Sequence, residues 1–178
     1  MEFSPFRNGD GWLLGVGDLG CGDAAGTRRA FEVRLPDSYH LYDTRAGQYL
    51  GKAETLQADL PRGGHRAYAL LPYRVTGVEV ALSAAVAVPG KLIRLAVRLQ
   101  TEGGKPSGHV LRVTAHASNQ KQGFFPFKRI VPLPENGALE LPLRLAYNDP
   151  NGVWKITVAD ISTGVEGTVP LTVRGGTE

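Results

Sequence analysis

Apolar and polar residues alternate along five segments in the second half of the chain. In the segment LIRLAVRLQ, residues 92–100, every second residue is aliphatic, and arginine and glutamine stand between them. A period of two is typical of a β-strand with one buried and one solvated face. Five such strands require a facing sheet that covers their apolar sides. The residues predicted to point inward are Ile93, Leu95, Val97, Leu99, Leu111, Val113, Ala115, Ala117, Leu139, Leu141, Leu143, Leu145, Trp154, Ile156, Val158, Val169, Leu171 and Val173.

Turn-forming residues separate these segments. Glycine, proline, asparagine and aspartate gather at EGGKPSG, PENG, NDPNG and STG, and they supply the backbone conformations that tight turns need. Pro142 and Pro170 occupy outward positions of their segments. Because proline cannot donate a ladder hydrogen bond, both strands are predicted to lie at a sheet edge or to be bulged there. The spacing predicts an immunoglobulin-like sandwich over residues 84–178.

The first half is also strand-like but less regular. No segment in it shows a convincing helical period over ten or more residues, and the 23 glycines and 12 prolines of the chain suit short strands better than helices. Extended segments are predicted at residues 11–17, 29–36, 39–44, 48–60, 65–73 and 77–83.

These patterns predict an all-β chain of two tandem antiparallel β-sandwiches. The first is a small sandwich over residues 1–83, and the second is the immunoglobulin-like sandwich over residues 84–178. The boundary near Ser83 lies in a continuous run without a Ser/Gly-rich linker. We therefore expect the two domains to hold a fairly fixed mutual orientation.

Charge and cysteine content argue against several classes of function. The net charge of +3 is modest, and the arginines occur singly between apolar residues, which is typical of solvated strand faces rather than of a nucleic-acid footprint. Cys21 is the single cysteine, so neither an intramolecular disulfide nor a metal site built on several thiolates is expected. No apolar run approaches the length of a membrane span, and no membrane insertion is expected.

Gly15, Gly17 and Gly20 form a literal G-x-G-x-x-G. In a dinucleotide-binding fold these glycines let the pyrophosphate approach the N-terminus of a helix that begins inside the motif. Here two more glycines and the strand-like run AFEVRLP follow. The pattern therefore predicts a glycine-rich loop between strands, and no cofactor is expected.

Polar residues do not form a recognisable catalytic or metal-binding pattern. The histidines, at positions 40, 65, 109 and 116, lack a close ligand pairing, so structural or surface roles are expected and no metal site. Within YHLYDTRAGQYLG, His40, Asp43 and Arg45 lack a second carboxylate at a spacing suited to hydrolysis. We interpret this stretch as strand, turn and strand, with Asp43 capping the turn. No catalytic residue is assigned.

Exposed aromatic rings are the candidates for contact with a carbohydrate or a partner. Tyr42 and Tyr49 are also candidates for core packing, since aromatic residues in sheets usually pack. The segment QGFFPFKR is broken by proline, which predicts a loop with at least one exposed ring. Trp154 lies in an alternating segment and is expected in the core. The candidate contact residues are Trp12, Tyr42, Tyr49, Phe124 and Phe125.

The stretch HLYDTRAGQYLGKAETLQADLPRGGHRAYALLPYRV, residues 40–75, contains YD, then G and YLG, and ends near YALLPY. This order resembles the C-terminal β-sandwich modules of large bacterial glycoside-hydrolase-like proteins, including those associated with β-galactosidase-type catalytic domains. The resemblance covers about residues 1–83. It implies a fold and a setting rather than an activity.

A second resemblance lies in the run G-x-W-x-I-x-V-x-D-x-x-T-G near the C-terminus. It is similar to the last two strands of bacterial immunoglobulin-like and macroglobulin-type modules, and more distantly to the jelly-roll domain that follows subtilisin-like convertases. Asp160 and Gly164 are expected to shape the hairpin, while the apolar residues fill the core. The residues that carry it are Gly152, Trp154, Ile156, Val158, Asp160, Thr163 and Gly164.

The two resemblances imply a non-catalytic accessory or structural region of a larger bacterial carbohydrate-active protein. Its expected partner is the catalytic domain of the same polypeptide or a polysaccharide, in an extracellular, periplasmic or cell-surface setting. One alternative is a carbohydrate-binding module. Another is a cell-surface adhesion or assembly protein, in which exposed strand edges pair and form a homo-oligomer.

Overall fold

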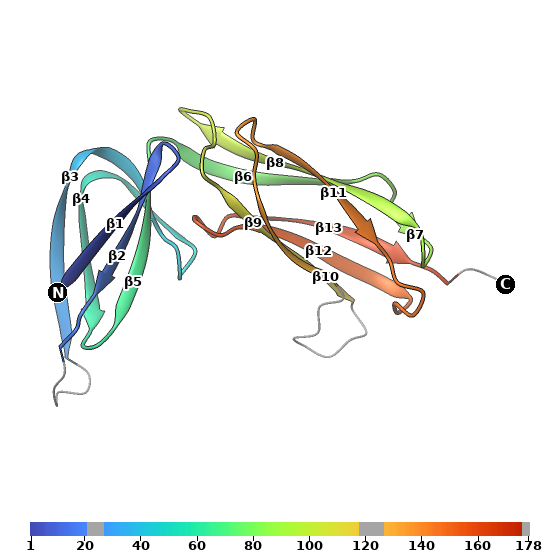
Figure 1. Ribbon diagram of the computed structural model, residues 1–178, viewed down its shortest axis with the longest axis horizontal. Helices are drawn as coiled ribbons and strands as arrows, with labels where there is room; N and C mark the ends of the chain where they lie inside the picture. The colour runs from blue at the N-terminus through green and yellow to red at the C-terminus, as the bar shows by residue number, and fades with distance from the viewer. Residues whose placement is uncertain (21–26, 118–126, 176–178) are drawn as a thin grey trace.

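The computed structural model describes residues 1–20, 27–117 and 127–175, and in these residues the chain is all-β. Figure 1 shows two lobes arranged end to end, each built of packed strands. None of the described residues belongs to a helix that is long and apolar enough to span a membrane.

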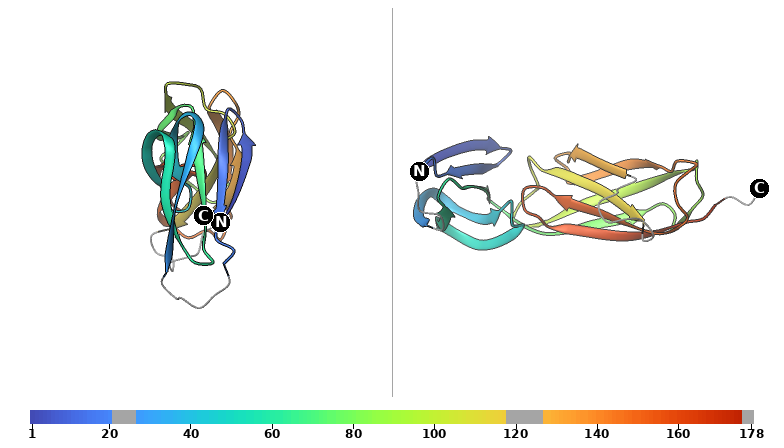
Figure 2. Two further views of the ribbon diagram at one scale, coloured as in Figure 1. Left: turned by 90° about the vertical axis from the view of Figure 1, so that its left-hand side faces the viewer. Right: turned by 90° about the horizontal axis from the view of Figure 1, so that it is seen from below.

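The first lobe contains one five-stranded sheet with the strand order β1-β2-β5-β3-β4. Its long β3–β4 hairpin changes register between Arg34 and Tyr39. At the turn end of the hairpin, residues 40–43 of β3 pair with β5. The other end of the hairpin folds over the sheet, which gives the two layers seen in the right-hand view of Figure 2. The small core between the layers includes Leu14, Leu56 and Leu60. The strands are β1 (Glu2–Asn8), β2 (Gly11–Gly17), β3 (Arg28–Asp43), β4 (Gln48–Pro61) and β5 (His65–Leu71).

The second lobe is a sandwich of two sheets, with the strand orders β11-β8-β6 and β10-β9-β12-β13-β7. All pairs are antiparallel except β13 and β7. After β6 the chain crosses to the other sheet, and this arrangement is that of an immunoglobulin-like sandwich. The strands are β6 (Arg74–Leu82), β7 (Val86–Ala87), β8 (Leu92–Glu102), β9 (Val110–Ala117), β10 (Phe127–Pro132), β11 (Ala138–Arg144), β12 (Gly152–Asp160) and β13 (Glu166–Val173).

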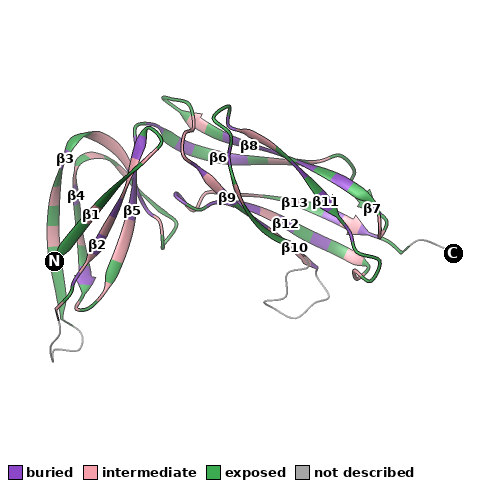
Figure 3. Cartoon of the chain, in the orientation of Figure 1, coloured by how far each residue is buried: buried purple, intermediate pink, exposed green. Residues whose placement is uncertain are grey.

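The predicted fold class and strand faces of the second sandwich are confirmed. Buried and exposed residues alternate along β8, β9 and β12, as Figure 3 shows. All predicted inward residues are buried except Leu139 and Val169, which pack against the core while partly exposed. Trp154 is 2% exposed and its indole nitrogen donates to the Pro150 carbonyl at 3.0 Å.

The prolines lie where the missing donor costs least. Pro142 is on β11, an edge strand. Pro170 is on β13, whose outer neighbour β7 pairs only with Thr172 and Val173. Opposite Pro170 the strand is therefore paired on one side, by Lys155 of β12, as expected for proline within a sheet.

Several elements differ from the sequence-based prediction. The predicted segments 29–36 and 39–44 lie, except for the last residue, in one bent strand, β3, because the hairpin stays paired on both sides of the bend. Phe127 begins strand β10 rather than lying in a loop. Strand β1 was not predicted, since Pro5 interrupts its pattern, but it pairs with β2 along its whole length.

The strand β6 bears on the domain boundary. It pairs with β8 from Arg74 to Leu82 and thus belongs to a sheet of the second sandwich, whereas the sequence pattern predicts it in the first domain. We propose on this ground that the division lies at Pro72–Tyr73 rather than near Ser83.

Two of the three glycines of the motif lie on a strand rather than in a loop. Gly15 and Gly17 belong to β2 and pair with β1 and β5. Gly20 lies three residues after the end of β2. Cys21 lies outside the described residues.

Candidate functional site

The junction between the two lobes is the most elaborate polar and apolar arrangement in the described part of the chain. Tyr42, Ala69 and Leu71 of the first sheet are buried in the same hydrophobic cluster as the core of the second sandwich. Tyr73, which links β5 to β6, joins this cluster. The core of the second sandwich thus extends onto the first sheet, and separating the lobes would expose this part of it to water.

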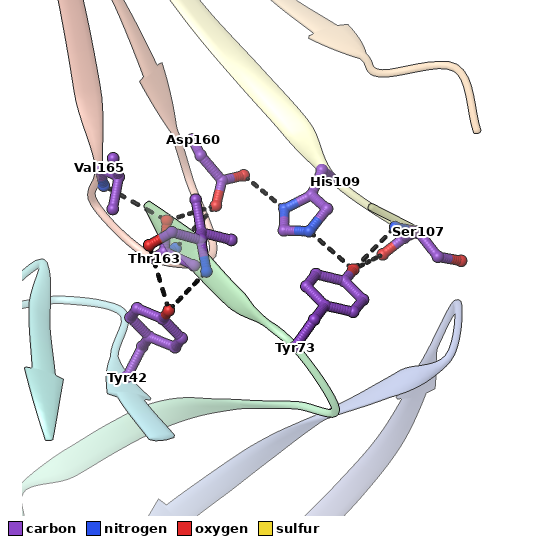
Figure 4. Close-up of polar contacts among 8 residues, drawn as sticks. Tyr42, Tyr73, Ser107, His109, Asp160, Thr163 and Val165 are labelled. Atoms are coloured by element: carbon purple, nitrogen blue, oxygen red, sulfur yellow. Dashed lines mark hydrogen bonds and ion pairs between the residues drawn. The ribbon is translucent and has the colours of Figure 1, made fainter. Parts of the chain in front are cut away.

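A hydrogen-bonded chain of buried side chains lies on the second-sandwich side of this junction (Figure 4). His109, directly before β9, lies with Nδ1 2.9 Å from Asp160 Oδ1 and Nε2 2.9 Å from the Tyr73 hydroxyl. The other carboxylate oxygen of Asp160 accepts hydrogen bonds from the Thr163 amide and hydroxyl at 3.1 and 2.6 Å. The Ser107 amide donates to the Tyr73 hydroxyl at 2.7 Å. Tyr73, His109 and Asp160 are each at most 3% exposed.

The side chains of this hydrogen-bonded chain all keep their hydrogen-bond partners whether the imidazole is neutral or protonated. A neutral His109 with its proton on Nδ1 donates to Asp160 and accepts from Tyr73. An imidazolium donates to both, and the Tyr73 hydroxyl then donates to the Ser107 carbonyl, 3.1 Å away. Burial raises the pKa of Tyr73 to about 12, so its hydroxyl keeps its proton at neutral pH.

A carboxylate, an imidazole and a hydroxyl in sequence also occur in nucleophilic catalysis, where the hydroxyl must reach a substrate. Here the hydroxyl belongs to a 2% exposed tyrosine whose oxygen is held by the Ser107 backbone. The arrangement therefore connects β12, β9 and the segment between the lobes, and its chemistry is that of a structural hydrogen-bond network.

Two further tyrosines extend the junction toward the surface. The Tyr42 hydroxyl accepts a hydrogen bond from the Val75 amide at 2.9 Å. The Tyr49 ring lies 5.0 Å from the Tyr42 ring, and the guanidinium of Arg74, on β6, lies 5.0 Å from its centroid. The Tyr49 hydroxyl is 2.8 Å from His40 Nδ1. Burial lowers the pKa of His40, and the nearby cations Lys52 and Arg74 lower it further against the opposing effect of Glu102.

Two pairs of glycines bring turns of the two lobes into backbone contact. A Cβ on Gly164, in the β12–β13 turn, would lie 2.3 Å from the Cα of Gly47, in the β3–β4 turn. A Cβ on Gly108 would lie 2.9 Å from the Gly9 amide nitrogen, in the β1–β2 turn. All four glycines have positive φ. Only glycine combines this backbone conformation with such a close approach.

The rings predicted as contact residues do not form one site. Tyr42 is 1% exposed, so its ring has no free face for a sugar, and its assignment as a contact residue is corrected to core packing. Tyr49 is 36% exposed, but His40, Tyr42 and Arg74 contact its ring. Phe124 and Phe125 lie outside the described residues.

Trp12 lies apart from the junction, in an apolar pocket of about 310 Å³ between the layers of the first lobe. Phe3, Pro5 and Tyr39 also line this pocket. The Arg7 guanidinium lies 5.1 Å from the centre of the Trp12 ring, in cation–π geometry. Among the predicted contact residues that the structure describes, Trp12 is thus the one that lines this apolar pocket.

Asp43 caps its turn as predicted, since its Oδ1 accepts from the amides of Arg45 and Ala46 at 3.0 and 2.9 Å. Asp160 shapes its hairpin through Thr163, also as predicted. Sequence reasoning missed the bond between Asp160 and His109, which are 51 residues apart. Across residues 1–20, 27–117 and 127–175, no three His, Cys, Asp or Glu side chains form a group that could hold a metal ion.

No protein-family model and no curated protein matches the sequence. Among solved structures, the Yersinia pseudotuberculosis adhesin InvE is similar at 15% identity and a TM-score of 0.41, with 94% of this chain and 55% of that chain covered. Native E. coli alpha-2-macroglobulin is similar at 12% identity and a TM-score of 0.41, with 94% and 19% covered. Apo Bacteroides uniformis beta-glucuronidase 3 is similar at 9% identity and a TM-score of 0.33, with 96% and 28% covered.

The chain spans 55% of the adhesin and smaller shares of the other two. No activity of this chain follows from likenesses at these identities and TM-scores.

Proposed function

We propose that the chain is a non-catalytic accessory region of a larger bacterial carbohydrate-active protein, in which it acts as a rigid brace. The observation that carries the proposal is the junction, where one hydrophobic cluster continues from the first sheet into the second sandwich. The buried Tyr73–His109–Asp160 chain supports it by fixing the segment between the lobes to β9 and β12, and the glycine pairs support it by holding turns of the two lobes in contact. The sequence resemblances support the carbohydrate-active setting.

A rigid brace keeps one distance between its two domains. Spin labels on cysteines introduced at Glu54 in β4 and Arg144 in β11, both exposed, in a Cys21→Ser background, report that distance. We expect a single narrow distance distribution in pulsed electron paramagnetic resonance, because the shared core leaves no freely moving linker. A broad or bimodal distribution would contradict the brace, and turnover of any glycoside by the purified chain would contradict the non-catalytic assignment.

A second candidate function, carbohydrate binding, is favoured by the pocket at Trp12. Apolar pockets with aromatic walls are the usual form of small-ligand sites. If this one holds a sugar, Trp12→Ala should weaken binding to the polysaccharide in the gel by about fivefold, since ring contacts contribute on the order of 1 kcal/mol. Phe6→Ala is the matched control, because Phe6 is a 61% exposed ring on β1 that does not line the pocket. Equal retardation of both variants, or none of the parent chain, would exclude this function.

A further inference from the structure

The outer face of the β10-β9-β12-β13 sheet carries basic side chains separated by threonines. Lys128, Thr114, Thr157 and Thr168 lie in one row across the four strands. In the next outward-facing row on one side, Lys155 lies opposite His116. In the next outward-facing row on the other side, Arg112 lies opposite Ile130. We call Arg112, Lys128, Lys155 and these threonines the basic face.

The two outer faces of the second sandwich differ in how their charges are balanced. On the β11-β8-β6 sheet, Arg98 stands opposite Glu79, and Arg94 forms an ion pair with Glu140 at 2.6 Å. Within the described ranges, none of the three cations of the basic face forms an ion pair. The carboxylate on this face is Glu166, at the start of β13 opposite Ala159.

Unbalanced like charges on neighbouring strands disfavour folding, and they create a local positive potential that attracts anions. Arg112, Lys128 and Lys155 are all exposed, whereas the apolar residues beside them point into the core. Lys128 and Lys155 lie two strands and two residues along the strand apart, which places their backbones about 12 Å from each other. The charges are therefore spread over a flat area rather than gathered at one point.

We propose that the basic face binds an acidic polysaccharide, one that carries carboxylate or sulfate groups. The cations supply charge complementarity. The threonine hydroxyls between them donate and accept hydrogen bonds, which suits the hydroxyl-rich parts of a sugar chain. This inference stands independently of the brace and of the Trp12 pocket, which lies in the other lobe.

The surface fits nucleic acid and lipid less well. Single-stranded nucleic acids are held by aromatic side chains that stack on bases, and the outward positions described on β9, β12 and β13 carry no phenylalanine, tyrosine or tryptophan. Helices that lie on membranes bury a broad apolar face with aromatic residues, whereas here exposed aliphatic residues such as Ile130 alternate with charges across the rows.

The test is affinity electrophoresis at low ionic strength in gels that contain polygalacturonate, with dextran as the neutral polymer. We expect the intact chain to be retarded by polygalacturonate and not by dextran. The triple variant Arg112→Gln, Lys128→Gln, Lys155→Gln should bind about tenfold more weakly.

A matched triple variant removes the same charge elsewhere: Lys91→Gln, Arg98→Gln, Arg144→Gln, all exposed positions away from the basic face. We expect it to bind as the intact chain does. If both triple variants bound polygalacturonate equally weakly, binding would depend on the net charge of the protein rather than on the basic face, and the proposal would be overturned. It would also be overturned if the intact chain ignored polygalacturonate, or if it bound only DNA or anionic phospholipid vesicles at matched charge.

Discussion

Replacement of Asp160 by alanine is expected to lower the free energy of unfolding by about 3–5 kcal/mol. Asp160 is fully buried, and its two oxygens accept from His109 and from the Thr163 amide and hydroxyl. Alanine leaves these donors without an acceptor in a place that water does not reach, and each unsatisfied buried group is costly. Urea denaturation followed by tryptophan fluorescence measures the change.

Two control variants separate burial from loss of charge. Asp160→Asn keeps one acceptor oxygen and should lose less stability than Asp160→Ala. Glu166→Ala removes an exposed carboxylate at the start of β13, and we expect a change within about 0.5 kcal/mol. If Asp160→Ala were as mild as Glu166→Ala, the buried chain would contribute nothing to the junction.

Gly164→Ala is expected to destabilise the chain by about 2–4 kcal/mol and to displace the lobes relative to each other. Its φ of 75° disfavours any residue with a Cβ. The new Cβ would also lie 2.3 Å from the Cα of Gly47, so the β12–β13 and β3–β4 turns must separate. Denaturation gives the loss of stability, and the spin-label distance between Glu54 and Arg144 gives the displacement.

Gly63→Ala is the matched control for this variant. Gly63 has a φ of 71°, but a Cβ there meets nothing within 4 Å. It should therefore cost only the backbone strain, on the order of 1–2 kcal/mol, and leave the interdomain distance unchanged. Equal effects of the two variants on stability and distance would show that the contact between the turns is not what holds the lobes.

The faces of the second sandwich could be predicted because they depend on local geometry. Successive side chains of a strand point to opposite sides, so the apolar residues from Ile93 to Leu99 share a face whichever strand lies beside them. The caps at Asp43 and Asp160 were predictable for the same reason, because each bonds amides within three residues. Proline in β1 and a proline-broken segment before β10 hid two strands from this kind of reasoning.

The candidate site was less accessible to prediction, because its members are distant in sequence. His109 and Asp160 carry no local signal of their contact, and Tyr73 looks like any aromatic residue at a strand end. The glycine pairs are equally hidden, since a turn glycine reads the same whether its turn faces solvent or another backbone.

By itself, the sequence determined the period of alternation and the places of the turns, and with them an all-β chain with a well-defined second core. Only the tertiary structure decided that β6 pairs with β8, that Tyr42 is buried, and that His109 lies between Asp160 and Tyr73. The physical reason is that a strand's pattern reports which of its faces is apolar, while its partner is chosen by packing among residues far apart in the chain.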